Sequence, residues 1–151
     1  MTPWRLRSKR RRNLADPLWT LREIVVATGG TSPASPAIEV TGFSIDSRSI
    51  APGEAFVAIR GLNRDGHEFA ASALEAGAAL AIVERDFAGA AVEDRLVRVG
   101  DTLESLNDLG RAARARAKDA VVIAVTGSAG KTGSKEALRL ALAPSGEVHA
   151  S

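Results

Sequence analysis

The sequence contains no cysteine and no tyrosine, and only two tryptophans and four phenylalanines among 151 residues. The lack of cysteine excludes disulfide bonds and thiolate metal sites, and it agrees with a reducing cytoplasm. No apolar run approaches the roughly 18–20 residues that a membrane-spanning helix needs, so we expect no membrane span. The hydrophobic fraction of 45% is instead typical of a soluble α/β protein of one ordinary domain or two small ones.

Positive charge is concentrated at the start of the chain. Six of the 20 basic residues fall within residues 1–12, and the other 14 are outnumbered by 18 acidic residues. We interpret residues 1–17 as a basic disordered arm that does not bind nucleic acid. The alternatives are a nucleic-acid or mitochondrial role, whereas a secretory signal is excluded because the apolar stretch it requires is missing.

Residues 18–99 alternate short helical and strand patterns. A capping-box spacing of Thr20 and Glu23 predicts a helix that ends at Gly29, and Asp65 is placed to start a second helix that stops at Gly77. Apolar and polar alternation, or short apolar runs, predict strands at residues 38–50, 54–59, 80–84 and 95–99. We therefore expect a small mixed α/β domain here.

From residue 100 the pattern changes to longer elements. A helix is expected from Asp101 to Lys118, followed by a near-continuous apolar run at 120–127, which is typical of a parallel strand covered on both faces. A second helix at 131–142 and a strand from 147 would follow. Residues 100–151 are thus predicted to be the truncated first half of a doubly wound P-loop ATPase domain. We expect residues 119–151 to be aggregation-prone or loosely held in isolation, because the sheet edge is open.

A glycine-rich turn joins the predicted strand to the helix at 131–142. Gly127 and Gly130 allow positive φ angles and a close approach to bare backbone, so successive N–H groups and the helix dipole face one point. Lys131 can reach the β- and γ-phosphates of a nucleotide, and the Thr132 hydroxyl can bind Mg²⁺. The spacing G-x-x-G-K-T is shorter than the common phosphate loop, and an ordinary strand–turn–helix with a solvated lysine is the alternative.

Two blocks of the sequence resemble the Mur ligase family, specifically its MurF-type branch. "VIAVTGSAGKTGSKEAL" at 122–138 is similar to the family's ATP loop. Between residues 40 and 84, the motifs "DSR", "PGEAFVAIRG" and "DGHEF" follow in the order found in the family's amino-terminal UDP-binding domain. The resemblance covers residues 18–151.

The resemblance implies a cytoplasmic, monomeric, ATP- and Mg²⁺-dependent ligase of peptidoglycan-precursor synthesis. ATP would phosphorylate the terminal carboxylate of UDP-N-acetylmuramoyl-tripeptide, and the amine of D-alanyl-D-alanine would attack the acyl phosphate. Lys131 would neutralise the transferring phosphate and Thr132 would hold Mg²⁺. The implied phosphate cradle is Gly127, Ser128, Ala129 and Gly130, and the implied UDP-substrate residues are Ser47, Arg48, Gly61, Asn63, Asp65, Gly66 and His67. For Arg48, Asp65 and His67 the alternatives are a pair with Asp46, a helix cap and a surface histidine.

The sequence also departs from the family pattern. Gly133 stands where a Thr or Ser is usual, and the downstream metal carboxylate, the carbamoylated lysine and the third domain have no counterpart. We therefore expect these residues alone not to catalyse the ligation. A MurE-type ligase that adds a diamino acid, and a non-catalytic UDP-sugar-peptide binding module, are the alternative functions. The "DSR" and "DGH" blocks argue against an unrelated phosphate-loop NTPase.

Overall fold

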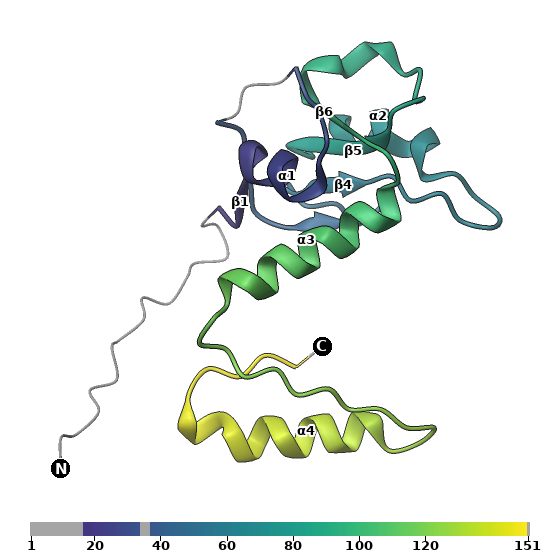
Figure 1. The fold of residues 1–151 in the computed structure, drawn as a ribbon. Coiled ribbons are helices and arrows are strands. Elements are labelled where there is room, and N and C mark those ends of the chain that lie inside the picture. The colour runs from purple at the N-terminus through teal and green to yellow at the C-terminus, as the bar shows by residue number, and fades with distance from the viewer. Residues whose placement is uncertain (1–16, 34–36, 151) are drawn as a thin grey trace. The chain divides into compact units, whose positions relative to one another are not determined.

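The computed structural model describes residues 17–33 and 37–150, apart from the side chains of residues 90–92, so nearly all of the predicted basic arm lies outside the described residues. The chain divides into two compact units, with the boundary between Arg116 and Ala117 (Figure 1). No helix in the described part is both long and apolar enough to cross a membrane.

The first unit is built on a parallel sheet. Its strands β3 (Phe43–Ser44), β4 (Ala55–Val57), β5 (Leu80–Glu84) and β6 (Leu96–Val99) pair in that order, all in parallel. Strands β1 (Trp19–Thr20) and β2 (Glu39–Val40) form a separate antiparallel pair. The mixed α/β class expected from the sequence is confirmed.

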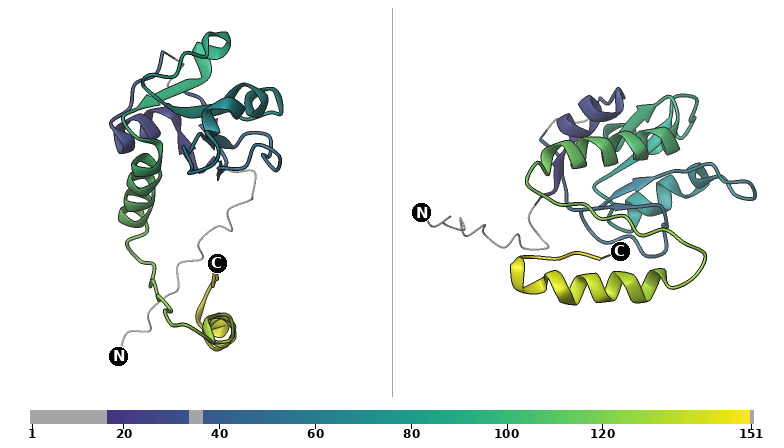
Figure 2. Two further views of the ribbon diagram at one scale, coloured as in Figure 1. Left: turned by 90° about the vertical axis from the view of Figure 1, so that its right-hand side faces the viewer. Right: turned by 60° about the horizontal axis from the view of Figure 1, so that its bottom comes forward.

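Helices cover both faces of this sheet. Helices α1 (Leu21–Thr28) and α3 (Thr102–Arg116) lie side by side on one face, and α2 (Ala70–Glu75) packs against the other (Figure 2). Short 3₁₀ segments, η1 (Gly66–Phe69) and η2 (Ala90–Arg95), lead into α2 and β6. The unit is therefore a three-layer arrangement.

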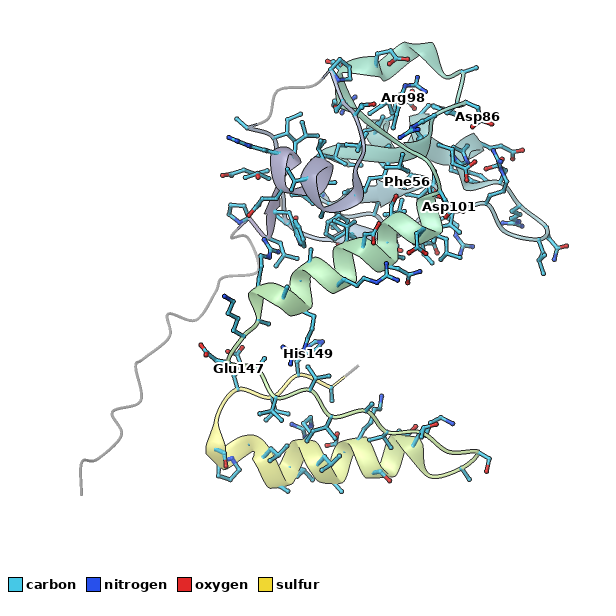
Figure 3. All side chains as sticks on the ribbon, viewed as in Figure 1. Phe56, Asp86, Arg98, Asp101, Glu147 and His149 are labelled. Carbon is cyan, nitrogen blue, oxygen red and sulfur yellow. The ribbon has the colours of Figure 1, made fainter. Side chains whose placement is uncertain are left out.

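Alternation along the central strands creates two cores. Leu80 and Ile82 of β5 point to the α1–α3 face, whereas Ala81 and Val83 point to the α2 face. Each is fully buried. Phe56 of β4 is the largest fully buried side chain of the α2-side core. Figure 3 labels it inside the first unit. Because successive side chains of a strand point to opposite faces, each covered strand contributes apolar residues to the cores under both helical layers.

Helix α1 forms where the sequence predicts it. Thr20 accepts a hydrogen bond from the Glu23 N–H at 3.3 Å, while the Glu23 carboxylate accepts from the Thr20 N–H at 2.7 Å, which completes the capping box. Gly29 ends the helix with a φ of 61°. In contrast, the single strand predicted at 38–50 splits at Thr41–Gly42, because β2 pairs with β1 and β3 pairs with β4.

The boundary between the units lies later than the one expected after residue 99. Helix α3 packs on α1, and its Leu109 is 3% exposed within the first unit's core. At the start of α3 the buried Thr102 hydroxyl donates to the Ala58 carbonyl at 2.9 Å. These contacts place α3 in the first unit, although the sequence pattern groups it with the phosphate loop.

The second unit contains α4 (Lys131–Leu142) and a short 3₁₀ turn, η3 (Ala143–Ser145). Helix α4 has the predicted bounds. The strand predicted at 120–127 is wrong in this structure, as is strand structure at 147–150: neither segment forms a strand or pairs in a ladder. A parallel strand needs a neighbour for its N–H and C=O groups, and the described residues of this unit offer none. None of those residues is buried.

Candidate functional site

One candidate region is the carboxyl edge of the four-stranded sheet. Because all four strands run in parallel, the loops that follow them leave the sheet at the same edge, which is where ligands bind in open α/β sheets. The loop after β3 contains Ser47 and Arg48, and the loop after β4 contains residues 58–67. All seven UDP-site residues expected from the resemblance fall in these two neighbouring loops.

The loop after β4 is short, and backbone hydrogen bonds close it at its base. Gly61 N–H donates to the Arg64 carbonyl at 2.8 Å, and Gly66 N–H donates to the Ile59 carbonyl at 2.9 Å. A Cβ on Gly66 would lie 2.7 Å from that same carbonyl oxygen, so the close return of the chain requires glycine here. At the tip, Leu62 and Asn63 are exposed.

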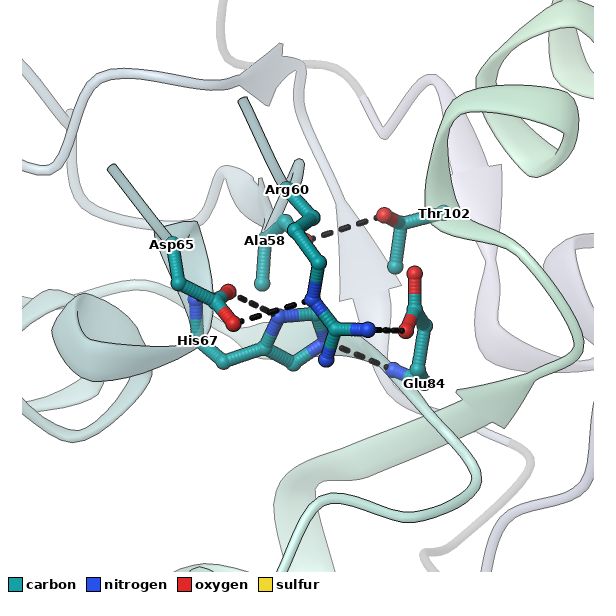
Figure 4. A network of polar contacts seen from close by, with 6 residues as sticks. All are labelled: Ala58, Arg60, Asp65, His67, Glu84 and Thr102. Atoms are coloured by element: carbon teal, nitrogen blue, oxygen red, sulfur yellow. Dashed lines mark hydrogen bonds and ion pairs between the residues drawn. The ribbon is translucent and has the colours of Figure 1, made fainter. Parts of the chain in front are cut away.

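His67 holds the return of this loop from the inside. It is 7% exposed, and Glu84 N–H donates to its Nε2 at 2.9 Å. Since that nitrogen accepts, Nδ1 carries the proton and donates to Asp65 Oδ1 at 2.5 Å (Figure 4). The ring is therefore a neutral link between the loop and β5. It is a buried histidine, not the surface histidine that was the sequence-based alternative.

Asp65 is the anchor of the loop. Its carboxylate accepts from the His67 N–H at 3.0 Å, which is the helix-cap role considered from the sequence. This backbone hydrogen bond, together with the one from the His67 ring, lowers the pKa of Asp65 to about 2. The carboxylate is thus ionised and committed to protein contacts.

Arg60 joins the two strand ends, and sequence reasoning missed it. Its Nε donates to Asp65 Oδ2 at 3.0 Å, and its Nη1 lies 2.9 Å from Glu84 Oε2 (Figure 4). The hydrogen bond to Asp65 and the nearby Glu84 charge raise the pKa of Arg60. The signal that could have found it is a pair of opposite charges at the ends of two successive predicted strands.

The "DSR" turn after β3 is held in a similar way. Arg48 donates from Nε and Nη2 to the two carboxylate oxygens of Asp46, at 2.9 and 2.7 Å. These bonds and one from the Arg48 N–H lower the pKa of Asp46 to about 2. The pairing of Arg48 with Asp46 considered from the sequence is present. Ser47, half-buried between them, makes no hydrogen bond among the described residues.

The second candidate region is the glycine loop before α4. Gly130 is the N-cap of α4 with a φ of 79°, and Gly127 has a φ of 148°, so both predicted glycines have positive φ angles. Lys131 folds back, and its Nζ donates to the Gly127 carbonyl. Ser128, Ala129 and Thr132 are exposed along with the rest of the loop.

This loop fits a phosphate group. No side chain caps the N-terminus of α4, so the first N–H groups of the helix are open to an external acceptor. The first turn carries no acidic residue, so no carboxylate repels an anion. A Cβ on Gly130 or on Gly133 would meet nothing within 4 Å, which leaves room around the loop. The geometry is that of an anion-binding helix start.

Parallel strands that end in polar loops, and a glycine loop that opens a helix, are each typical of nucleotide-binding α/β proteins. The catalytic-domain model of the Mur ligase family matches residues 39–139. The UDP-N-acetylmuramoyl-tripeptide--D-alanyl-D-alanine ligase of Rickettsia prowazekii is 32% identical over 129 residues, covering 83% of this chain and 27% of that protein. The UDP-N-acetylmuramoyl-L-alanyl-D-glutamate--2,6-diaminopimelate ligase of Chlorobaculum tepidum is 40% identical over 94 residues, covering 62% and 18%.

A solved structure gives the same result. The crystal structure of MurF ligase from Thermotoga maritima in complex with ADP matches with a TM-score of 0.56 and 35% identity, covering 68% of this chain and 23% of that one. The chain belongs to the Mur ligase family, as its two motif blocks predict. It spans less than a third of the length of these relatives.

Proposed function

We propose that this chain supplies the UDP-substrate unit and the ATP phosphate loop of a MurF-type ligase of peptidoglycan-precursor synthesis. In this reaction ATP would convert the terminal carboxylate of UDP-N-acetylmuramoyl-tripeptide into an acyl phosphate with release of ADP, and the amine of D-alanyl-D-alanine would displace phosphate. The observation that carries the proposal is the uncapped start of α4 behind Gly127 and Gly130. The proposal includes a cytoplasmic, monomeric enzyme.

In the phosphate loop, the roles follow from the chemistry of each group. The N–H groups of residues 128–132 would donate to phosphate oxygens, and Lys131 would exchange its bond to Gly127 for a phosphate oxygen. Mg²⁺ would neutralise phosphate charge, and the Thr132 hydroxyl would bind it. Gly133 adds no hydroxyl to this set, which leaves Ser134 as the next one along the helix.

At the sheet edge, the free groups differ from the committed ones. Asp65, His67 and Arg48 are occupied by protein contacts, so their proposed contribution is to shape the two loops. Ser47 and Asn63 have side chains available to a ligand, and Gly61 and Gly66 allow the backbone to pass closely. We propose that these loops hold the uridine diphosphate part of the substrate.

A MurE-type ligase is the second candidate. The 40% identity to the Chlorobaculum tepidum ligase, within the part of the chain that the two share, favours this candidate. A non-catalytic UDP-binding module is the third, and it would require that the phosphate loop not bind ATP. Substrate titrations separate the first two, since only a MurF-type protein prefers the tripeptide over the dipeptide.

The central experiment measures Mg-ATP binding to the 151-residue chain by calorimetry. Lys131→Ala should weaken binding about tenfold or more, because a charge-assisted bond to phosphate is lost. Lys118→Ala, an exposed lysine of the same unit, is the matched control and should leave the Kd unchanged. Equal affinities for wild type and Lys131→Ala would contradict the phosphate assignment.

A further inference from the structure

Arg60 stands out among the polar residues because it connects two strand ends. It follows β4, and its two carboxylate partners come from the substrate loop and from the last residue of β5. Its side chain is 51% exposed, while that of Glu84 is only 16% exposed. A half-exposed ion pair contributes little to folding stability, typically about 0–1 kcal/mol. Stability alone therefore gives no sufficient reason for this arrangement.

Direct binding of an anion by Arg60 is disfavoured by its surroundings. Asp65 and Glu84 lie within 3.0 Å of the guanidinium, and Asp86 adds a further negative charge nearby. The immediate net charge is thus negative, which repels a phosphate group. Arg60 instead holds two carboxylates together, one from the loop and one from the end of β5.

The bridge that Arg60 makes to Asp65 and Glu84, called the clamp below, fixes the position of the loop tip. Figure 1 shows residues 60–65 extending from the end of β4 away from the sheet. The exposed tip carries Leu62, which is 104% exposed, so no core contact holds it. The orientation of the tip is therefore determined at its base, where Arg60 and Asp65 face each other in an isolated bridge. Without the arginine, the side-chain support of that base would be the Asp65–His67 pair alone, beside the backbone hydrogen bonds of Gly61 and Gly66.

Arg64 is the cation that the clamp leaves available. It is exposed at the tip, its carbonyl accepts from Gly61, and its side chain has no acidic partner among the described residues. Arg48, in the neighbouring loop, is already neutralised by Asp46. Of the arginines in these two loops, Arg64 is the one whose charge a phosphate would meet unopposed.

We propose that Arg60 is a positioning residue for the substrate nucleotide: by bridging Asp65 and Glu84 it fixes the loop so that Arg64 meets the diphosphate of UDP. This inference rests on the proposed UDP-binding function of the same edge. In this inference Arg60 acts indirectly, by fixing the loop, whereas Arg64 contacts the ligand.

The test titrates UDP into the 151-residue chain by calorimetry. Arg60→Gln and Arg64→Gln should each raise the Kd about tenfold, and Arg60→Lys, which can keep one of the two bridges, should fall between wild type and Arg60→Gln. Arg22→Gln on α1 is the exposed control and should not change the Kd. The melting temperature of Arg60→Gln should stay within about 2 °C of wild type.

A double variant separates positioning from direct contact. If Arg60 acts through Arg64, Arg60→Gln combined with Arg64→Gln should bind no more weakly than Arg64→Gln alone. The Gly61 amide should also exchange faster in Arg60→Gln, because the loop base loosens. Additive losses, or an unchanged Kd for Arg60→Gln, would overturn the inference alone. No binding of millimolar UDP by the wild-type chain would overturn the UDP assignment and this inference together.

Discussion

Two isoleucines in similar apolar runs have opposite surroundings in this molecule. Ile82 lies in β5 between two partner strands and is fully buried, whereas Ile123 lies in the unpaired segment before the glycine loop and is 50% exposed. Both runs have the composition of a covered parallel strand. The difference teaches that an apolar run records a capacity for strand formation, which is realised only where neighbours complete the ladder.

The largest expected effect tests this contrast directly. Ile82→Ala should destabilise the first unit by about 2–5 kcal/mol, because it leaves a cavity between the sheet and the α1–α3 layer. Ile123→Ala should change the unfolding free energy by less than about 0.5 kcal/mol. Urea unfolding followed by Trp19 fluorescence, in a Trp4→Phe background, measures both. Similar losses for the two variants would break the comparison.

A glycine in each unit sharpens the comparison further. Gly66→Ala should cost about 1–3 kcal/mol, since its Cβ would press on the backbone of Ile59. Gly133→Ala, in the first turn of α4, meets open space and should instead raise helix content slightly, as alanine favours helices by up to about 1 kcal/mol over glycine. Thermal unfolding and far-ultraviolet circular dichroism report the two changes. The same sign for both would show that crowding at Gly66 is relieved by a small shift of the loop.

The smallest expected effect is a pH dependence of the first unit. The pKa of Asp65 is lowered to about 2, so its ionised form stabilises the folded loop fully above about pH 4, and this contribution is lost as the pH falls through 2. The melting temperatures of wild type and Asp65→Asn should therefore differ at pH 6 and converge near pH 2. In the second unit, Glu136→Gln should leave the helix content nearly unchanged, because its pair with Arg139 is exposed. A constant difference between wild type and Asp65→Asn across pH would contradict the assignment.

Local chemistry explains which elements could be predicted from the sequence. The Thr20–Glu23 capping box, the helix start after Gly130 and the strand at Leu80–Glu84 depend on residues close in the chain, and all three form where the pattern predicts them. The split between β2 and β3 and the packing of α3 on α1 depend on distant partners, which no local pattern contains.

The same distinction applies to the candidate site. The glycine loop before α4 is a contiguous motif, and the positive φ angles of Gly127 and Gly130 agree with its predicted shape. The bridge from Arg60 to Glu84 joins residues from different strands, and it becomes visible only when β4 and β5 are paired. The role of each site residue toward a ligand stays a prediction.

The contacts of Arg116 have a consequence for the modularity of the first unit. This last residue of α3 lies over the Trp19 ring at 3.6 Å, donates to the Leu18 carbonyl at 3.3 Å and pairs with Glu23 at 3.2 Å. The first residues that the structure describes in this unit and the end of its last helix are therefore neighbours, close enough for a short peptide to join them. A core whose first and last elements are adjacent can be circularly permuted or moved as a cassette between larger proteins without re-routing its strands.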